Sequence, residues 1–278
     1  LSELFIVVIP VMSIGILSTF YKDYGKNEKW LNLAMLVGVI GEIVSIAALT
    51  ILNAYVKYGI DIKLFLNLGA LVGFMLITVF VFRSLDVLFW WYPNLKKALM
   101  PYFDKSEKDI RLSIALLCLV IAIVAILDVN IVIGAFIAGT FIPTFFDHKK
   151  ELPEKLSSFG YGFLVPIFFA YIGSTVNLSA IFMPGVMKMV LFLTVLMLFV
   201  RLISSITMIK ALGVKESILF GVSLSIPLTL LIATATIGKE TNYIDDATYY
   251  ALVLTSITQA IVCTTLVKVI KNLKFNKK

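Results

Sequence analysis

The sequence is poor in the residue types that enzymes and disulfide-bonded proteins use. Charged residues make up 15% of its 278 residues, and it holds two cysteines and one histidine, whereas an ordinary soluble domain has about 25% charged residues. Both cysteines lie inside apolar runs, which is typical of small core residues. No phosphate-binding glycine loop, Ser/His/Asp set or cluster of metal ligands is present. We therefore expect neither an enzyme nor a resident cofactor.

What the sequence does contain is a series of long apolar stretches. Hydrophobic residues make up 60% of the chain, and the mean hydropathy is +1.00. A helix that crosses a bilayer needs about 20 mostly apolar residues. The sequence predicts an all-α polytopic membrane protein with about nine transmembrane helices, at about 4–20, 30–56, 64–92, 110–127, 130–146, 158–178, 186–209, 215–238 and 246–270.

The basic residues are distributed unevenly among the loops between these spans. The chain has 24 Lys and Arg residues and a net charge of +7, and most of them lie in alternate loops and in the C-terminal tail. This is the asymmetry of the positive-inside rule, so the basic balance predicts a cytoplasmic C-terminus and no nucleic-acid partner.

Two charged residues lie where lipid disfavours them. Glu42 is at the centre of the apolar stretch 33–50, between Gly41 and, one turn later, Ser45. A charged residue at mid-membrane costs about 2.5–3.5 kcal/mol on insertion scales, so Glu42 is expected to bind an ion or a proton or to pair with a cation. Arg201 is the second such residue, and Glu42 is its candidate partner. The alternative is that Arg201 lies near the membrane surface and reaches the headgroups.

Prolines beside hydroxyl residues interrupt the first and the eighth predicted spans. Proline removes a backbone donor and frees a carbonyl one turn earlier, and irregular backbone is tolerated at membrane depth where it lines a site. Interrupted spans in separated parts of a chain favour a transporter site built on inverted repeats, and two ordinary proline kinks are the alternative. The residues that predict the two discontinuous helices are Pro10, Ser13 and Gly15, and then Ser225, Pro227 and Thr229.

Four stretches together resemble the monovalent cation:proton antiporters of the bacterial and archaeal Kef/NapA-like branch. They are SIGIL, GAFIAGTFIP, PIFFAYIGSTVNL and GVSLSIPLTLLIATATIG, which begin at residues 13, 134, 166 and 221. The resemblance covers almost the whole chain but starts partway into the family pattern, so the first three or four helices of the family are expected upstream. It implies crossed discontinuous helices, a homodimer and a multi-pass protein of a prokaryotic cell membrane. It also implies core helices in 1–60 and 186–278, a linking helix and cytoplasmic loop in 61–109, and scaffold helices in 110–185.

The same resemblance assigns roles to individual residues. Glu42 stands at the family's ion-binding aspartate, and Gly41 stands where many members have a second aspartate or an asparagine. Arg201 stands at a basic residue that interacts with the acidic site, and Ser13 falls in the first unwound segment. The sequence SIPLT departs from the glycine–glutamate pair of Kef-like members, and the single acid departs from the usual pair.

The resulting hypothesis is a secondary antiporter that exchanges Na⁺ or K⁺ for protons by alternating access. Cation and proton compete for Glu42, hydroxyls and freed carbonyls near Ser13 and Ser45 complete the cation's ligands, and Arg201 neutralises the empty carboxylate. One carboxylate predicts one-for-one exchange, and the transported cation is the only metal expected. An organic-anion symporter with Arg201 as the counter-charge and a non-transporting degenerate homologue are the alternatives.

Overall fold

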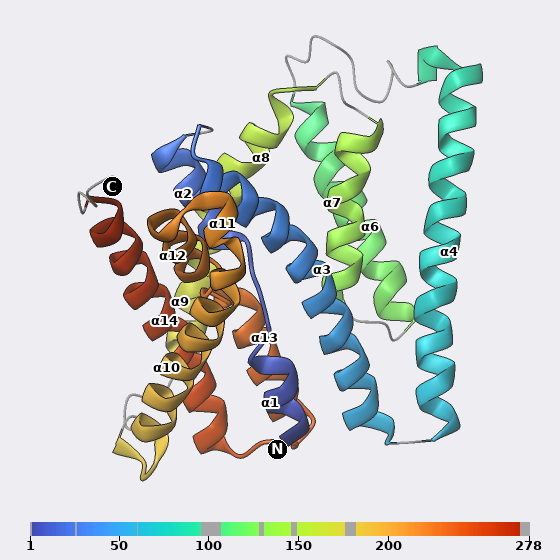
Figure 1. Ribbon diagram of the computed structural model, residues 1–278. Coiled ribbons are helices and arrows are strands. Elements are labelled where there is room, and N and C mark those ends of the chain that lie inside the picture. The colour runs from blue at the N-terminus through green and yellow to red at the C-terminus, as the bar shows by residue number, and fades with distance from the viewer. Residues whose placement is uncertain are drawn as a thin grey trace. The chain divides into compact units, whose positions relative to one another are not determined.

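The computed structural model describes residues 2–25, 27–59, 61–95, 107–127, 131–145, 149–175 and 182–272. These residues form helices and connecting segments without strands, as the sequence predicted (Figure 1). The chain divides into two compact units, residues 1–57 with 176–278 and residues 58–175. Most of the predicted cytoplasmic loop, residues 96–106, and the tail after residue 272 lie outside the described part. The predicted core and scaffold roles stay predictions.

The first unit contains both interrupted helices and the two charged residues of interest. Its last helix ends beside the start of its third, where the Lys271 ammonium pairs with the Glu28 carboxylate and holds the pKa of Glu28 below its ordinary value. The helices are α1 (Ser2–Val8), α2 (Gly15–Tyr24), α3 (Lys29–Tyr58), α10 (Val186–Ser205), a short 3-10 segment with α11 (Ile209–Leu212), α12 (Val214–Ser223), α13 (Leu228–Glu240) and α14 (Asp246–Asn272).

The second unit consists of α4 (Ile62–Trp91), α6 (Lys108–Ile126), α7 (Ile131–Phe145), α8 (Leu152–Phe159), a π-helical turn and α9 (Val165–Thr175). One of its buried clusters joins aromatic rings of α4 and α7 to α8. Helix α8 begins six residues before the predicted sixth span, because Leu152 is fully buried in that cluster and Pro153 favours a first helical turn. The π-helical turn occupies Gly160–Leu164.

Six helices in the described part are long and apolar enough to cross a membrane. They are Lys29–Tyr58, Ile62–Trp91, Lys108–Ile126, Val186–Leu212, Val214–Glu240 and Asp246–Asn272, and each overlaps a predicted span. The other predicted spans are shorter or interrupted in the structure, since α1, α2 and α7 have 7, 10 and 15 residues. The chain is thus a polytopic helical membrane protein, and the count of nine helices stays a prediction.

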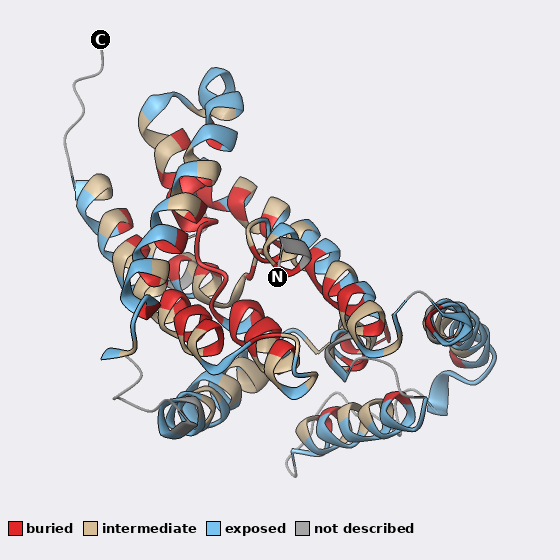
Figure 2. Cartoon of the chain, turned by 90° about the horizontal axis from the view of Figure 1, so that it is seen from below, coloured by how far each residue is buried: buried red, intermediate tan, exposed pale blue. Residues whose placement is uncertain are grey.

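Two helix pairs are broken at prolines. Helix α1 ends at Val8 and α2 begins at Gly15, so Pro10 lies in non-helical backbone; α12 ends at Ser223 and α13 begins at Leu228, directly after Pro227. Among the six candidate spans, the one that α12 and α13 form has the largest buried share. Figure 2 shows buried residues in red where the helices of this unit meet. The backbone of the second break, residues 224–227, is therefore enclosed by protein, as the lack of hydrogen-bond partners in lipid requires, whereas Pro10 in the first break is exposed.

Close packing of α10 on α12 gives a testable prediction at Gly221. A Cβ atom there would lie 2.9 Å from the Cβ of Ser205 and 3.1 Å from the carbonyl oxygen of Arg201, and backbone cannot move aside as a flexible side chain can. We expect Gly221→Ala to lower the free energy of unfolding by about 1–3 kcal/mol, measured by thermal unfolding in detergent. Gly139→Ala is the matched control, because nothing lies within 4 Å of its added Cβ. Equal stability of the two variants would contradict the close approach.

Candidate functional site

The site is built around the non-helical segment between α1 and α2, and Arg201 holds this segment in place. Arg201 lies on α10, and only 8% of its surface is exposed. Its Nη2 donates to the carbonyl oxygen of Pro10, and to that of Val11 at 3.0 Å. A guanidinium offers five donors in a fixed plane, which suits two adjacent carbonyls that no helix uses. The buried charge is thereby paired with backbone dipoles.

The predicted partner of Arg201 was Glu42. Within the described part of the chain, no ion pair joins these two side chains. The carbonyls of Pro10 and Val11, in the segment whose freed carbonyls were predicted to help bind the cation, accept from Arg201. An arginine inside an apolar span needs hydrogen-bond acceptors, and this need is visible in the sequence, whereas the identity of the acceptors is not.

Ser45 fixes the same segment from the side of α3. The backbone N–H of Met12 donates to the Ser45 hydroxyl oxygen at 3.0 Å, and that hydroxyl donates to the carbonyl of Gly41 at 2.6 Å. Gly41 allows this close approach, because a Cβ there would lie 2.2 Å from the Met12 sulfur. A larger residue at position 41 would therefore require the Met12 side chain to move.

Glu42 is half-buried and faces the start of α2. Its carboxyl group lies near the backbone N–H of Ile14 and the hydroxyl of Ser13. Ile14 is the residue directly before α2, and the first N–H groups of a helix have no partner within it and favour negative charge. The break in the first span thus supplies donors to the carboxylate.

Ser13 also joins the two interrupted helices. Its hydroxyl lies 2.9 Å from the hydroxyl oxygen of Thr229, in the first turn of α13. Ser13 is buried, whereas Thr229 is exposed. The structure therefore brings together Glu42 on α3, Ser13 in the first break and Thr229 on α13, three side chains that carry oxygen.

The remaining predicted residues shape the backbone around this group. Gly15 is the first residue of α2, and Pro227 directly precedes α13. Ser225 is buried in the second break, where its hydroxyl donates to the Gly221 carbonyl at 2.9 Å. The Ser225 carbonyl oxygen lies 4.0 Å from the sulfur of Cys263 on α14, so this helix reaches the second break as well.

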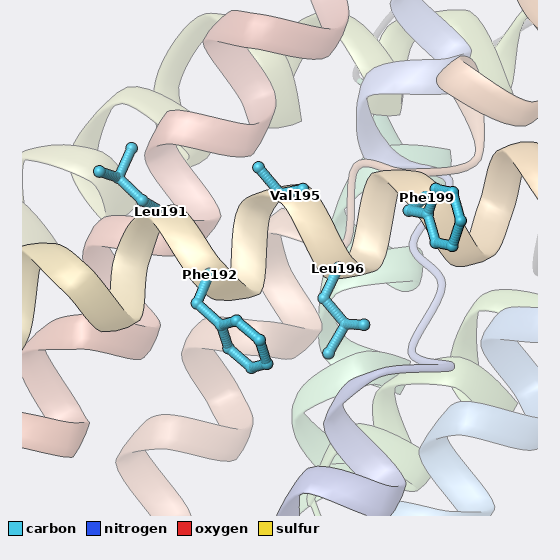
Figure 3. Close-up of a pocket in the computed structure, with 5 residues that line it drawn as sticks. All are labelled: Leu191, Phe192, Val195, Leu196 and Phe199. Atoms are coloured by element: carbon cyan, nitrogen blue, oxygen red, sulfur yellow. The ribbon is translucent and has the colours of Figure 1, made fainter.

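The hollows on the surface of α10 are of a different kind. One of about 390 Å³ is lined by Leu191, Phe192, Val195, Leu196 and Phe199 (Figure 3), and another of about 360 Å³ lies between α1 and α10 with a similarly apolar lining. Neither offers an oxygen ligand. Such apolar surfaces suit contact with lipid or with apolar protein. Arg201 is not among the residues that line them.

Three buried side chains near these helices have polar atoms without a hydrogen-bond partner in the described part of the chain. They are Thr194 on α10, Ser217 on α12 and Gln259 on α14, and both polar atoms of Gln259 are unpaired. An unsatisfied buried polar group costs about 1–3 kcal/mol. Gln259 was not among the predicted site residues, although an amide inside an apolar span is a signal that the sequence shows.

The chemistry of the site is that of oxygen ligands. No group of three or more His, Cys, Asp or Glu side chains gathers within the described residues. Carboxylate, hydroxyl and carbonyl oxygens suit hard cations and protons, and a carboxylate can take up either.

Comparisons with known proteins agree with this chemistry. Over 286 aligned residues, the chain is 27% identical to a protein of Methanocaldococcus jannaschii named as a Na⁺/H⁺ antiporter, and the match covers 100% of this chain and 70% of that protein. It is 27% identical over 259 residues to a Bacillus subtilis protein also named as a Na⁺/H⁺ antiporter, of which it covers 40%. A cation/H⁺ antiporter of Arabidopsis thaliana is 28% identical over 141 residues, 17% of its length.

A family-level match covers nearly the whole chain. Residues 2–272 match the family described as the transmembrane sodium/hydrogen exchanger, and this range includes both breaks, Glu42 and Arg201. The chain belongs to the sodium/hydrogen exchanger family.

Proposed function

We propose that the chain is the transport part of a secondary antiporter that exchanges a monovalent cation for protons, with Glu42 as the shared binding group. The observation that carries this proposal is the hydrogen bond between the Ser13 and Thr229 hydroxyls, which joins the two breaks, with the Glu42 carboxyl group near Ser13 and Ile14. A cation bound to the Glu42 carboxylate could therefore also be bound by the hydroxyl oxygens of Ser13 and Thr229.

The exchange follows from competition for one group. With a proton bound, the carboxyl is neutral; with a cation bound, the pair is neutral as a whole. Either state can cross a low-dielectric barrier at far lower cost than the bare carboxylate. Alternating access then requires the helices that carry Glu42 and the breaks to move against the rest of the protein. Because a single carboxylate takes one cation or one proton, the exchange is one for one and electroneutral.

Arg201 has a positional part in this mechanism. Its contacts to the Pro10 and Val11 carbonyls keep the first break open, and this leaves Ser13 free to face Glu42. Ser45 has the complementary role on the other side, since it holds the Met12 N–H.

The two alternative functions have less support. An organic-anion symporter would present Arg201 to a polar cavity, whereas the hollows described above have apolar linings that do not include it. A non-transporting homologue would bury its acidic residue, whereas Glu42 is half-buried and Thr229 is exposed. The antiporter names of the relatives also favour cation exchange.

Reconstitution of the full-length protein in liposomes tests the proposed function. With a pH gradient reported by an internal dye, we expect addition of Na⁺, K⁺ or Li⁺ to release protons from the vesicles, without a membrane potential developing. Choline chloride is the control for ionic strength. Proton movement that is the same with choline as with every cation would overturn the proposal.

A further inference from the structure

The side-chain oxygens gathered at the proposed site are the Glu42 carboxylate and the hydroxyls of Ser13 and Thr229. The Ser45 hydroxyl and the carbonyls of Pro10 and Val11 already take part in hydrogen bonds with other groups. Hard cations are held by several oxygen ligands, so a further oxygen ligand is to be expected near the two breaks.

Gln259 on α14 is a buried amide whose polar atoms have no protein partner within the described residues. Its exposed fraction is 0%, and neither its amide oxygen nor its amide nitrogen has a hydrogen-bond partner within the described residues. Its buried neighbours on α14 differ in this respect, since Thr255 and Ser256 donate to carbonyls of their own helix. Buried polar groups in proteins are almost always paired with protein, water or a ligand, so the free amide points to a bound species.

The register of α14 places Gln259 at the level of the second break. Cys263 lies one turn further along the same buried face, and its sulfur is 4.0 Å from the Ser225 carbonyl oxygen. Only residues 241–245 separate α13 from α14, and the two helices pack together, so they run antiparallel. Gln259 lies four residues before Cys263, which is about 6 Å along the axis of α14. Because α13 and α14 run in opposite directions, this places Gln259 at about the level of Thr229, four residues after Ser225.

We propose that the amide oxygen of Gln259 is a ligand for the transported cation at the break between α12 and α13. This rests on the proposed function, because it names a further ligand for the same ion. An amide suits the position: its oxygen is a good ligand for a hard cation, and it carries no charge, so the exchange remains electroneutral. The amide nitrogen can donate to a carbonyl that the break leaves free.

The test is the dependence of proton release on Na⁺ concentration in liposomes that hold the full-length protein. We expect Gln259→Met, which keeps the length of the side chain and removes the amide, to raise the KM for Na⁺ about tenfold and to change the maximal rate by less than about twofold. Thr255→Val is the matched control, because that hydroxyl lies one turn away on the same face and is paired within the helix. Its KM should stay at the wild-type value.

A second variant covers the case in which Gln259→Met does not fold. Gln259→Glu is nearly isosteric and adds a carboxylate, so it should lower the KM for Na⁺ at alkaline pH. A KM within twofold of wild type in whichever of these variants folds would overturn the assignment, with the proposed function intact. A wild-type protein that releases no protons with any cation would overturn both.

Discussion

Glu42→Gln is expected to abolish cation-driven proton movement while leaving the protein folded. The amide has nearly the same shape as the carboxyl, and its oxygen can still accept from groups such as Ser13 and the Ile14 N–H near it. It does not take up a proton, however, and it carries no negative charge to attract a cation. Two unit charges about 4 Å apart attract by about 4 kcal/mol at an effective dielectric constant of about 20. Loss of that term lowers cation affinity by about 100-fold or more, and the variant has no titrating group to carry the proton.

The measurement is proton release from liposomes on addition of each cation, with thermal unfolding in detergent as the check on folding. Glu42→Asp is the conservative control: it keeps the charge, shortens the side chain by one methylene, and should retain activity with an altered KM. Glu28→Gln controls for removal of a carboxylate elsewhere in the same unit, where the group pairs with Lys271. Retention of exchange by Glu42→Gln would remove the shared carboxylate from the mechanism.

Much of the architecture could be predicted from the sequence because lipid imposes simple rules. An apolar stretch must be helical and about 20 residues long, so the six observed candidate spans overlap predicted ones. The start of α8 was missed because its residues are not uniformly apolar; their burial depends on contacts of Leu152 with distant aromatic rings. The position where α8 begins thus depends on tertiary packing, which hydropathy alone does not predict.

At the candidate site, too, the sequence predicted which side chains need partners but not which partners they have. A glutamate and an arginine inside apolar spans both need partners, and opposite charge made them candidates for each other. The structure pairs Arg201 with the backbone carbonyls of Pro10 and Val11 in the break between α1 and α2, and Glu42 lies near Ile14, directly before α2. Backbone groups are the same in every residue type, so no sequence pattern states which of them a side chain will find.

Arg201→Leu is expected to destabilise the protein and to slow exchange strongly. The variant leaves the carbonyls of Pro10 and Val11 without their donor. Hydrogen bonds to a charged group contribute about 1.5–3 kcal/mol each, so the free energy of unfolding should fall by about 3 kcal/mol or more. Since the same segment positions Ser13 against Glu42, we also expect the exchange rate to fall about tenfold or more. Arg201→Lys should lose less in both, because an ammonium can still donate to adjacent carbonyls.

A double-mutant cycle with Glu42→Gln separates the observed contacts of Arg201 from the ion pair that the sequence suggested. If Arg201 acts on the carbonyls of the first break, Arg201→Leu should lower the melting temperature by a similar amount in the wild-type and Glu42→Gln backgrounds. If Arg201 acted mainly as the counter-charge of Glu42, then once one of the two charges had been removed, removing the other would cause little further loss of stability. The coupling energy between the two mutations would then reach about 0.5–3 kcal/mol. A large coupling would therefore contradict the positional role of Arg201, and near-additivity would support it.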